Sequence, residues 1–486
     1  KKRVFKLDTP NTTYAFHVTN SNHLLHLYYG ASIPETDITH MLRIPNDEPF
    51  VPSTHDGMGP HSFDCAAIEF PTSGVADFRE PCMQLMDKYG MSACECYYDS
   101  YAIYKGKKKL EGLPATYANT DDEVTSLEVY CKDPHNGLEI TLQYSVFEKL
   151  DVITRSVKVK NGGADPIELR RLLSACVELD SKDYDMITLY GTWARERHVQ
   201  RNPLHFGKQL VDSCRGATSH AHNNFIAIVD HKATEDYGDC YGFALCYSGS
   251  FVAGCEVNQY EKTRVFSGIN PYDFSWHLDL GEEFQAPEVI MVFSASGIGT
   301  MSRTFHDVMR NNLTRGKWKD IRRPILINNW EATYFNFNTE KLIDIAKQAS
   351  QLGIEMLVMD DGWFGHRDKD NSSLGDWHVY EKKLPGGLKS LVDKVRAMGL
   401  KFGIWFEPEM VSPDSDLYRA HPDWAIQVPG RELTLCREQY VLDYSRQDVR
   451  EYVYGMLRDI LTSADISYVK WDMNCLLYTS PSPRDA

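Results

Sequence analysis

The sequence predicts a multidomain β plus α/β protein, in which an N-terminal antiparallel β-sandwich is followed by the first half of a (β/α)8 TIM-type barrel. Two observations lead to this fold class. Up to about residue 300, short runs rich in Val, Ile, Tyr, Phe and Thr alternate with turn signals. From residue 325 onward, strand-like runs alternate instead with amphipathic helical runs, which is typical of a parallel sheet.

Residues 1–300 form the predicted sandwich domain. The runs GLEITLQYSVFEKL (137–150) and VITRSVKVKNGG (152–163) alternate apolar and polar residues with period two. This alternation suits strands with one buried and one solvated face. Turn signals such as DPHNG and YSGS separate the runs, and no long amphipathic helix is predicted before residue 300.

Residues 301–324 are predicted to be a helical linker. MSRTFHDVMRNNL (301–313) has a helical pattern, and the basic run GKWKDIRRP (316–324) follows it. Before this segment the sequence predicts strands only, and after it the sequence predicts strands that alternate with helices. This change of pattern indicates a domain boundary.

Residues 325–474 contain four predicted strand-plus-helix units. The strands are expected in ILINNW, IEMLVMDDGW, KFGIWFEPEM and ISYVKWD. Each ends in polar or aromatic residues, as in barrels whose active-site groups gather at the carboxyl ends of the strands, whereas an open sheet concentrates such groups at one switch point. A full barrel takes about 250 residues, so half a barrel is expected. Leu357, Ile404 and Tyr468 are expected to face its interior.

Composition and charge narrow the function classes. The 486 residues are 42% hydrophobic and 25% charged, and the formal net charge is −16, which is ordinary for a globular protein. Nucleic acids and anionic membranes favour basic surfaces, so the acidic balance argues against both and leaves a small-molecule ligand. Since the sequence shows neither a membrane-spanning run nor a secretory segment, a cytoplasmic location is expected.

The cysteines do not predict a metal site. Twelve Cys are scattered along the chain, without paired CxxC elements or a CxxC with a trailing His. Structural thiols are therefore expected, and neither a metal nor a cofactor is predicted.

Two opposite charges share one face of the last predicted strand. Side chains alternate along a strand, so Lys470 and Asp472 point the same way in ISYVKWDMN (466–474). A carboxylate kept ionised by a neighbouring cation at a strand end is a candidate nucleophile. A structural ion pair is the alternative interpretation, and the spacing alone does not exclude it.

Further candidates follow the other strands. Asp360 and Asp361 end an apolar strand, where adjacent carboxylates can hold a divalent metal or bind two neighbouring sugar hydroxyls. The run DDGW is equally a turn signal. Four tryptophans lie at or just beyond strand ends, where an aromatic face can stack on a sugar ring, although aromatic residues more often belong to a core: Trp330, Trp363, Trp377 and Trp405.

Taken together, these segments resemble glycoside hydrolase family 36, the retaining bacterial α-galactosidases. FPTSGVADFREP (70–81) and RGATSHAHNNFIAI (215–228) resemble parts of that family's β-supersandwich domain. Six later segments resemble its barrel motifs in order: RPILINNWEATYF, LVMDDGWFGHR, LGDW, GIWFEPEMVS, CREQYVLDYS and YVKWDMN.

The resemblance implies a role for each candidate. Asp472 would be the nucleophile, and Asp360 and Asp361 would bind galactose hydroxyls. The same subsite would be lined by Trp405, Arg437, Lys470 and Asn474, with Trp330 at its rim. It further implies a homotetramer in which a sandwich loop, for which we select residues 70–81, helps to close a neighbour's active site.

The implied activity is hydrolysis of terminal α-linked galactose from oligosaccharides of the melibiose or raffinose type, by a retaining double displacement. The acid/base would be an Asp on a later barrel strand. Residues 475–486 do not resemble the family, so we expect them to be a non-native tail on a C-terminally truncated chain that is inactive alone. The alternatives are an α-N-acetylgalactosaminidase or transglycosylase of the same fold, a non-catalytic carbohydrate-binding fragment, and a metal-dependent phosphatase or isomerase that uses Asp360 and Asp361.

Overall fold

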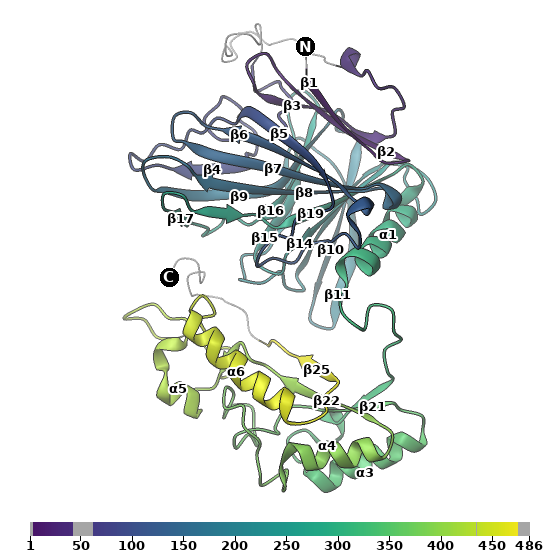
Figure 1. The fold of residues 1–486 in the computed structure, drawn as a ribbon, viewed down its shortest axis with the longest axis vertical. Helices are drawn as coiled ribbons and strands as arrows, with labels where there is room; N and C mark the ends of the chain where they lie inside the picture. The colour runs from purple at the N-terminus through teal and green to yellow at the C-terminus, as the bar shows by residue number, and fades with distance from the viewer. Residues whose placement is uncertain (1–2, 42–61, 434, 475–486) are drawn as a thin grey trace. The chain divides into compact units, whose positions relative to one another are not determined.

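A computed structural model describes residues 3–41, 62–433 and 435–474 of the chain (Figure 1). The chain divides into two units, residues 1–319 and 320–486. The segment 475–486, which we expect to be a non-native tail, lies outside the described residues. Within the described part, no helix is long and apolar enough to cross a membrane.

Unit 1 consists of antiparallel sheets. The first is β1 (Arg3–Asp8), β2 (Thr12–Val18) and β3 (Leu24–Ala31). The largest sheet has its strands in the order β11 (Arg195–Pro203), β10 (Tyr184–Thr192), β13 (His222–Asp230), β14 (Cys240–Cys246), β19 (Glu288–Ser294), β8 (Val152–Asn161), β7 (Leu138–Phe147), β6 (Thr125–Lys132) and β5 (Tyr97–Lys105). In the same sheet, β18 (Glu283–Gln285) pairs with β8. The third runs in the order β12 (Gly207–Asp212), β15 (Phe251–Val257), β16 (Thr263–Ile269), β9 (Ile167–Leu179) and β17 (Trp276–Leu278), with β4 (Met83–Met86) paired to β9.

Strand β19 shows how period-two alternation builds two cores in unit 1. Val289, Met291 and Phe293 belong to the large core that all three sheets share. Ile290 and Val292 point to the other face and belong to a second cluster. Because both faces are covered, residues 289–293 of β19 are apolar without alternation in sequence.

The second cluster forms beneath helix α1 (Gly297–Val308). Met301, Phe305 and Val308 of this helix are buried among side chains of the largest sheet, and α1 packs against β14 and β19 (Figure 1). A π-helical turn, Met309–Leu313, continues it. Most of the segment that the sequence assigns to a linker is therefore part of unit 1, which extends to Lys319.

Unit 2 contains a parallel sheet in the order β20 (Leu326–Asn328), β21 (Met356–Met359), β22 (Lys401–Phe406) and β25 (Tyr468–Trp471). A short antiparallel pair accompanies it, β23 (Met410–Val411) and β24 (Tyr440–Val441). The helices are α2 (Trp330–Thr333), α3 (Thr339–Gln351), α4 (Gly387–Ala397), α5 (Asp416–Ala420) and α6 (Gln447–Ser463). Helices α3 and α4 lie side by side and pack against β21 and β22 (Figure 1).

Helix α3 has clear start and stop signals. The Asn338 side chain accepts a hydrogen bond from the backbone N–H of Lys341 at 3.0 Å, which satisfies one of the free donors at the helix start. Gly353 follows the helix with φ +79°, a conformation that favours glycine. Between these ends, Leu342, Ala346 and Ala349 form the buried face.

The sheet of unit 2 has two different faces. Leu357 and Ile404 are fully buried in the cluster that includes the apolar faces of α3, α4 and α6. The expectation that these two residues face the barrel interior is therefore wrong. Tyr468 pairs with Gly403 on the opposite face and is exposed. Strands buried on both faces lack alternation, so the sequence alone does not tell which side faces the helices.

Candidate active site

The polar residues at the carboxyl ends of the four parallel strands meet at one edge of the sheet in unit 2. Strand pairing places Trp405 of β22 opposite Lys470 of β25. Asn328 at the end of β20 is paired with Val358, two positions before Asp360. Parallel strands in register bring their carboxyl ends together, which is why residues more than 140 positions apart in sequence form one cluster.

Asp360 is held by two donors from different strands. Lys470 Nζ lies 2.8 Å from Asp360 Oδ2, and Asn328 Nδ2 donates to the same oxygen at 2.5 Å. The backbone N–H of Asp360 donates to Asn329 Oδ1 at 2.8 Å. The Asp360 side chain is 3% exposed, so this carboxylate is buried but paired, as a buried charge requires.

Asp361 has a different cation. Arg367 grips its carboxylate with two hydrogen bonds, Nε to Oδ1 at 2.6 Å and Nη2 to Oδ2 at 2.8 Å. Burial raises the pKa of the Asp361 carboxyl, and the Arg367 guanidinium opposes that rise. Arg367 is itself buried and donates to the backbone oxygens of Asp370 and Ser372. Each carboxylate of the dyad therefore has its own protein cation.

Asp472 lies directly after β25. Its backbone N–H donates to the Phe406 carbonyl at 2.8 Å, which continues the pairing of β25 with β22 by one residue. Trp405 Nε1 donates to Asp472 Oδ2 at 3.2 Å. The carboxylate is thus oriented by an indole N–H, while Lys470 on the same strand is paired with Asp360 rather than with Asp472.

Glu407 is a buried carboxyl that is not among the site residues predicted from the sequence. It follows β22 directly, is 1% exposed, and its Oε1 accepts the backbone N–H of Asn474 at 2.7 Å. Burial raises the pKa of Glu407 to about 7, hydrogen bonds from Asn474 oppose the rise, and the charge of Asp472 adds to it. The signal was present in the sequence as an acidic residue at a strand end, in GIWFEPEMVS.

Arg437 and Trp330 lie at the margin of this cluster. Arg437 has φ +49°, its side chain is 45% exposed, and its Nη2 lies 3.3 Å from Asp370 Oδ2. Asp370 in turn lies 3.7 Å from Arg367, so Arg437 is linked to Asp361 through two intermediate charges. Trp330 starts α2 and donates its backbone N–H to Asn328 Oδ1 at 2.7 Å.

Three of the four candidate tryptophans belong to the core. Trp363 and Trp377 are buried in the apolar cluster of unit 2, and Trp363 Nε1 donates to the Trp405 backbone oxygen at 2.9 Å. Trp405 is also buried, yet its indole N–H is directed at Asp472. Only Trp405 among these three thus has a polar contact with the candidate nucleophile in the described contacts.

The arrangement suits neutral hydroxyl groups better than a metal. In residues 3–41, 62–433 and 435–474, no group of three or more His, Cys, Asp or Glu is arranged to hold a metal ion. Asp360 and Asp361 are each compensated by a protein cation, so their combined charge is already neutralised. A carboxylate fixed in this way still accepts further hydrogen bonds through its remaining lone pairs.

Two family models match the chain. One is described as the glycosyl hydrolase family 36 N-terminal domain and matches residues 22–279. The other is described as melibiase and matches residues 283–486. Together they cover both units of the structure.

Named relatives are similar over almost the whole chain. The α-galactosidase AgaA of Geobacillus stearothermophilus is 48% identical over 471 residues, which are 97% of this chain and 64% of the relative. The bifunctional α-galactosidase/sucrose kinase AgaSK of Mediterraneibacter gnavus is 42% identical over 477 residues, 97% of this chain and 50% of the relative. The chain thus spans between half and two thirds of the length of these curated relatives.

Solved structures show the same fold. The crystal structure of AgaA has a TM-score of 0.96 and 47% identity, and covers 98% of this chain and 66% of that one. A variant of that enzyme in complex with raffinose has the same TM-score and 46% identity, and likewise covers 98% of this chain and 66% of that chain. These comparisons confirm the predicted fold class, an antiparallel β-supersandwich followed by part of a TIM-type barrel.

Proposed function

Because the chain belongs to glycosyl hydrolase family 36, we propose that it carries the nucleophile and the galactose subsite of an α-galactosidase. The substrates are terminal α-linked galactose residues of melibiose- or raffinose-type oligosaccharides. Relatives named as α-galactosidases support the activity, and the AgaA variant in complex with raffinose supports this type of substrate.

The observation that carries the proposal is the cluster of differently held carboxylates at one sheet edge. Asp472 is the nucleophile that attacks the anomeric carbon and forms a glycosyl-enzyme intermediate. The Trp405 N–H holds one of its oxygens, which fixes the direction of attack. Asp360 and Asp361, paired with Lys470 and Arg367, accept hydrogen bonds from galactose hydroxyls.

A retaining glycosidase also needs a second carboxyl, about 5–5.5 Å from the first, which acts as acid and then as base. Glu407 is not suited to that role, because it is buried and already accepts the Asn474 N–H. The resemblance assigns the acid/base to an Asp on a later barrel strand. Glu407 instead holds the end of β25 in place beneath Asp472.

The substitution Asp472→Asn tests the proposal. It preserves the size of the side chain but removes the nucleophile, so we expect the hydrolysis of an aryl α-galactoside by a catalytically competent preparation to fall about 10³-fold or more. Galactose binding should persist. Asp459→Asn, on the exposed face of α6, is the matched control. Hydrolysis close to the parent rate would exclude Asp472 as nucleophile.

We also propose that the enzyme is a cytoplasmic homotetramer. The free thiols of the described cysteines suit a reducing compartment. The loop 70–81 is a candidate subunit contact, because Asp77 and Arg79 anchor one end of it in buried ion pairs while Gly74, at φ +88°, lies exposed in its turn. Light scattering that gave a monomer mass for an active preparation would exclude the tetramer.

A further inference from the structure

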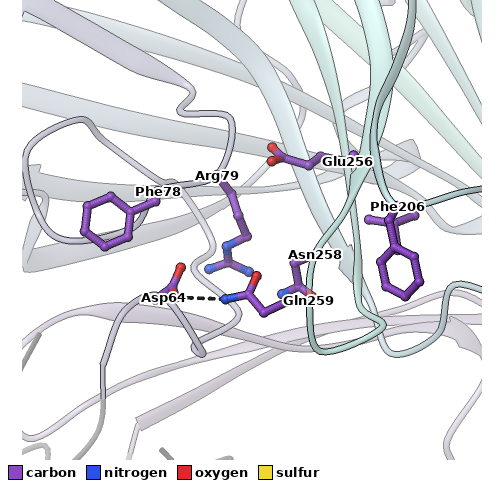
Figure 2. Close-up of a pocket in the computed structure, with 9 residues that line it drawn as sticks. Asp64, Phe78, Arg79, Phe206, Glu256, Asn258 and Gln259 are labelled. Carbon is purple, nitrogen blue, oxygen red and sulfur yellow. Dashed lines mark hydrogen bonds between the residues drawn. The ribbon is translucent and has the colours of Figure 1, made fainter. Parts of the chain in front are cut away.

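An open cavity of about 640 Å³ lies at one edge of unit 1 (Figure 2). It is formed where β12 begins, at the edge of the six-stranded sheet, and where the neighbouring strand β15 ends. None of its lining residues belongs to the cluster around Asp472. Its volume is within the range of ~300–1,000 Å³ that small-molecule sites occupy.

Two phenylalanine rings flank the opening. Phe78 is 70% exposed and Phe206 is 59% exposed. Figure 2 shows the two rings on opposite sides of a group of polar side chains. Single exposed apolar residues are common on proteins, but two large rings beside one opening indicate a contact site.

Acceptor groups lie between the rings. Gln259 Nε2 donates to Asp64 Oδ2 at 2.9 Å, which orients both side chains (Figure 2). Glu256 uses Oε2 to accept the backbone N–H of Glu80 at 2.7 Å. A carboxylate has about four acceptor positions, so both carboxylates retain the capacity to bind hydroxyl groups.

The floor of the cavity is fixed. Arg79 is buried and donates to Asp77 Oδ1 and to the backbone oxygens of Phe63 and Ala66. Asn258 accepts the N–H groups of Tyr260 and Lys262, which holds the turn after β15. A surface that is already ordered loses little conformational entropy when a ligand binds.

The charges exclude anionic ligands. Arg79, the cation of the lining, is compensated by Asp77, while Asp64 and Glu256 carry negative charge. Anions such as phosphate would be repelled. Rings that stack on C–H faces, together with acceptors for hydroxyl groups, suit a neutral polyhydroxylated molecule.

We propose that this cavity is a second carbohydrate site, which binds a neutral oligosaccharide between Phe78 and Phe206 without hydrolysing it. The inference goes beyond the proposed hydrolytic function and does not depend on it. It requires that the exposed turn at Gly74, and not Phe78, makes the subunit contact proposed for loop 70–81. The site would retain an oligosaccharide on unit 1 by stacking and by hydrogen bonds to Asp64 and Gln259.

Fluorine NMR of the 486-residue chain tests this inference. The chain is labelled with 4-fluorophenylalanine, carries Asp472→Asn to prevent turnover, and is titrated with raffinose. Phe78→Leu and Phe206→Leu assign the two resonances. We expect both resonances to shift along one saturable curve, and Gln259→Ala to weaken that binding about tenfold. Gln200→Ala, on exposed β11 of the same unit, is the matched control and should leave it unchanged.

Three results would overturn the inference. The first is that neither resonance moves with raffinose. The second is an equal movement with glycerol, which would indicate a general effect of polyols. The third is a change of assembly mass in light scattering when Phe78 and Phe206 are both replaced by alanine, which would assign the rings to a subunit contact. Since the readout is local to unit 1, a failure of the hydrolytic proposal at Asp472 would leave the test intact.

Discussion

Lys470 on β25 forms an ion pair with Asp360 at the end of β21, 2.8 Å away, although strand β22 separates the two strands in the sheet. The pair bridges the sheet above Trp405, which lies on the strand between them. A long cationic side chain is needed to cover this distance. The ion pair therefore couples the position of the strand that carries Asp472 to the position of Asp360, one of the two carboxylates proposed to bind sugar.

Lys470→Met is expected to lower both stability and sugar affinity. It leaves the buried Asp360 carboxylate with only Asn328 as a side-chain partner, and removing one member of a buried pair is costly. Because Lys470 is partly exposed, we expect a loss of about 1–3 kcal/mol in the free energy of unfolding, measured by urea titration. Galactose affinity should fall as well.

The exposed pair Lys389–Asp393 on α4 is the control for this measurement. Lys389→Met removes a similar ion pair at 2.7 Å, but both partners are in solvent, so the loss should be about 0–1 kcal/mol. Equal effects of the two substitutions would show that the Lys470–Asp360 pair is a surface ion pair without special importance.

Glu407→Gln is expected to change how stability depends on pH. The pKa of Glu407 is about 7 in the folded chain, against about 4.3 in an unfolded one. Between these two pKa values the folded state binds more protons than the unfolded state. The contribution of Glu407 to the free energy of unfolding therefore falls as pH rises from about 4 to 7, and it stays constant at higher pH. The difference in the free energy of unfolding between Glu407→Gln and the parent should therefore shift in favour of the variant by about 2–3 kcal/mol between pH 5 and pH 8.

Urea unfolding at both pH values, followed by tryptophan fluorescence, measures this difference. Glu340→Gln, on the exposed side of α3, is the matched control and should show a pH-independent offset. Other buried carboxyls titrate in both proteins and cancel in the comparison. A constant difference between Glu407→Gln and the parent would mean that Glu407 is not protonated near neutral pH.

Arg367→Lys is expected to weaken substrate binding while keeping the charge. Lysine cannot reproduce the two parallel hydrogen bonds to Asp361, nor the bonds to the Asp370 and Ser372 backbone oxygens. Asp361 should lose its fixed orientation, so we expect KM to rise about tenfold with a smaller fall in kcat. Arg446→Lys, in an exposed pair with Asp448, is the control. A normal KM would indicate that Asp361 does not contact the sugar.

Trypsin is expected to separate the two units at the segment 314–325. Lys319 and Arg322 lie there without regular secondary structure, whereas Arg303 and Arg310 lie in the helical segment packed on unit 1. The resistant fragment, measured by mass spectrometry, should therefore retain α1 and end at Lys319 or Arg322. Early cleavage after Arg303 would instead show that α1 is a linker.

The residues at the strand ends could be predicted from the sequence because each one directly ends or follows a strand that short-range composition reveals. Asp360, Trp405, Lys470 and Asp472 each end or follow a strand that its composition identifies, and parallel pairing brings those ends together. Four residues from three separate motifs are thus found in one cluster.

What the sequence did not predict depends on long-range packing. Glu407 is unusual only because the folded chain buries it beside Asp472, and Arg367 only because it folds back on Asp361. The sequence also could not tell on which face of the sheet Leu357 and Ile404 lie, because the central strands are apolar on both faces. Helix α1 was recognised, but its attachment to unit 1 required the sheet beneath it.

Strand β25 has one neighbour, β22, in the described sheet, so its alignment depends on few backbone bonds. A slip by one residue would turn every side chain to the other face. Lys470 would then enter the apolar layer beneath the helices, and Trp471, which is 57% exposed, would face the carboxylates. The ion pair with Asp360 thus makes the wrong alignment unfavourable during folding. Lys470 and Asp360, which are proposed to line the sugar site, therefore also fix the register of the strand that carries Lys470.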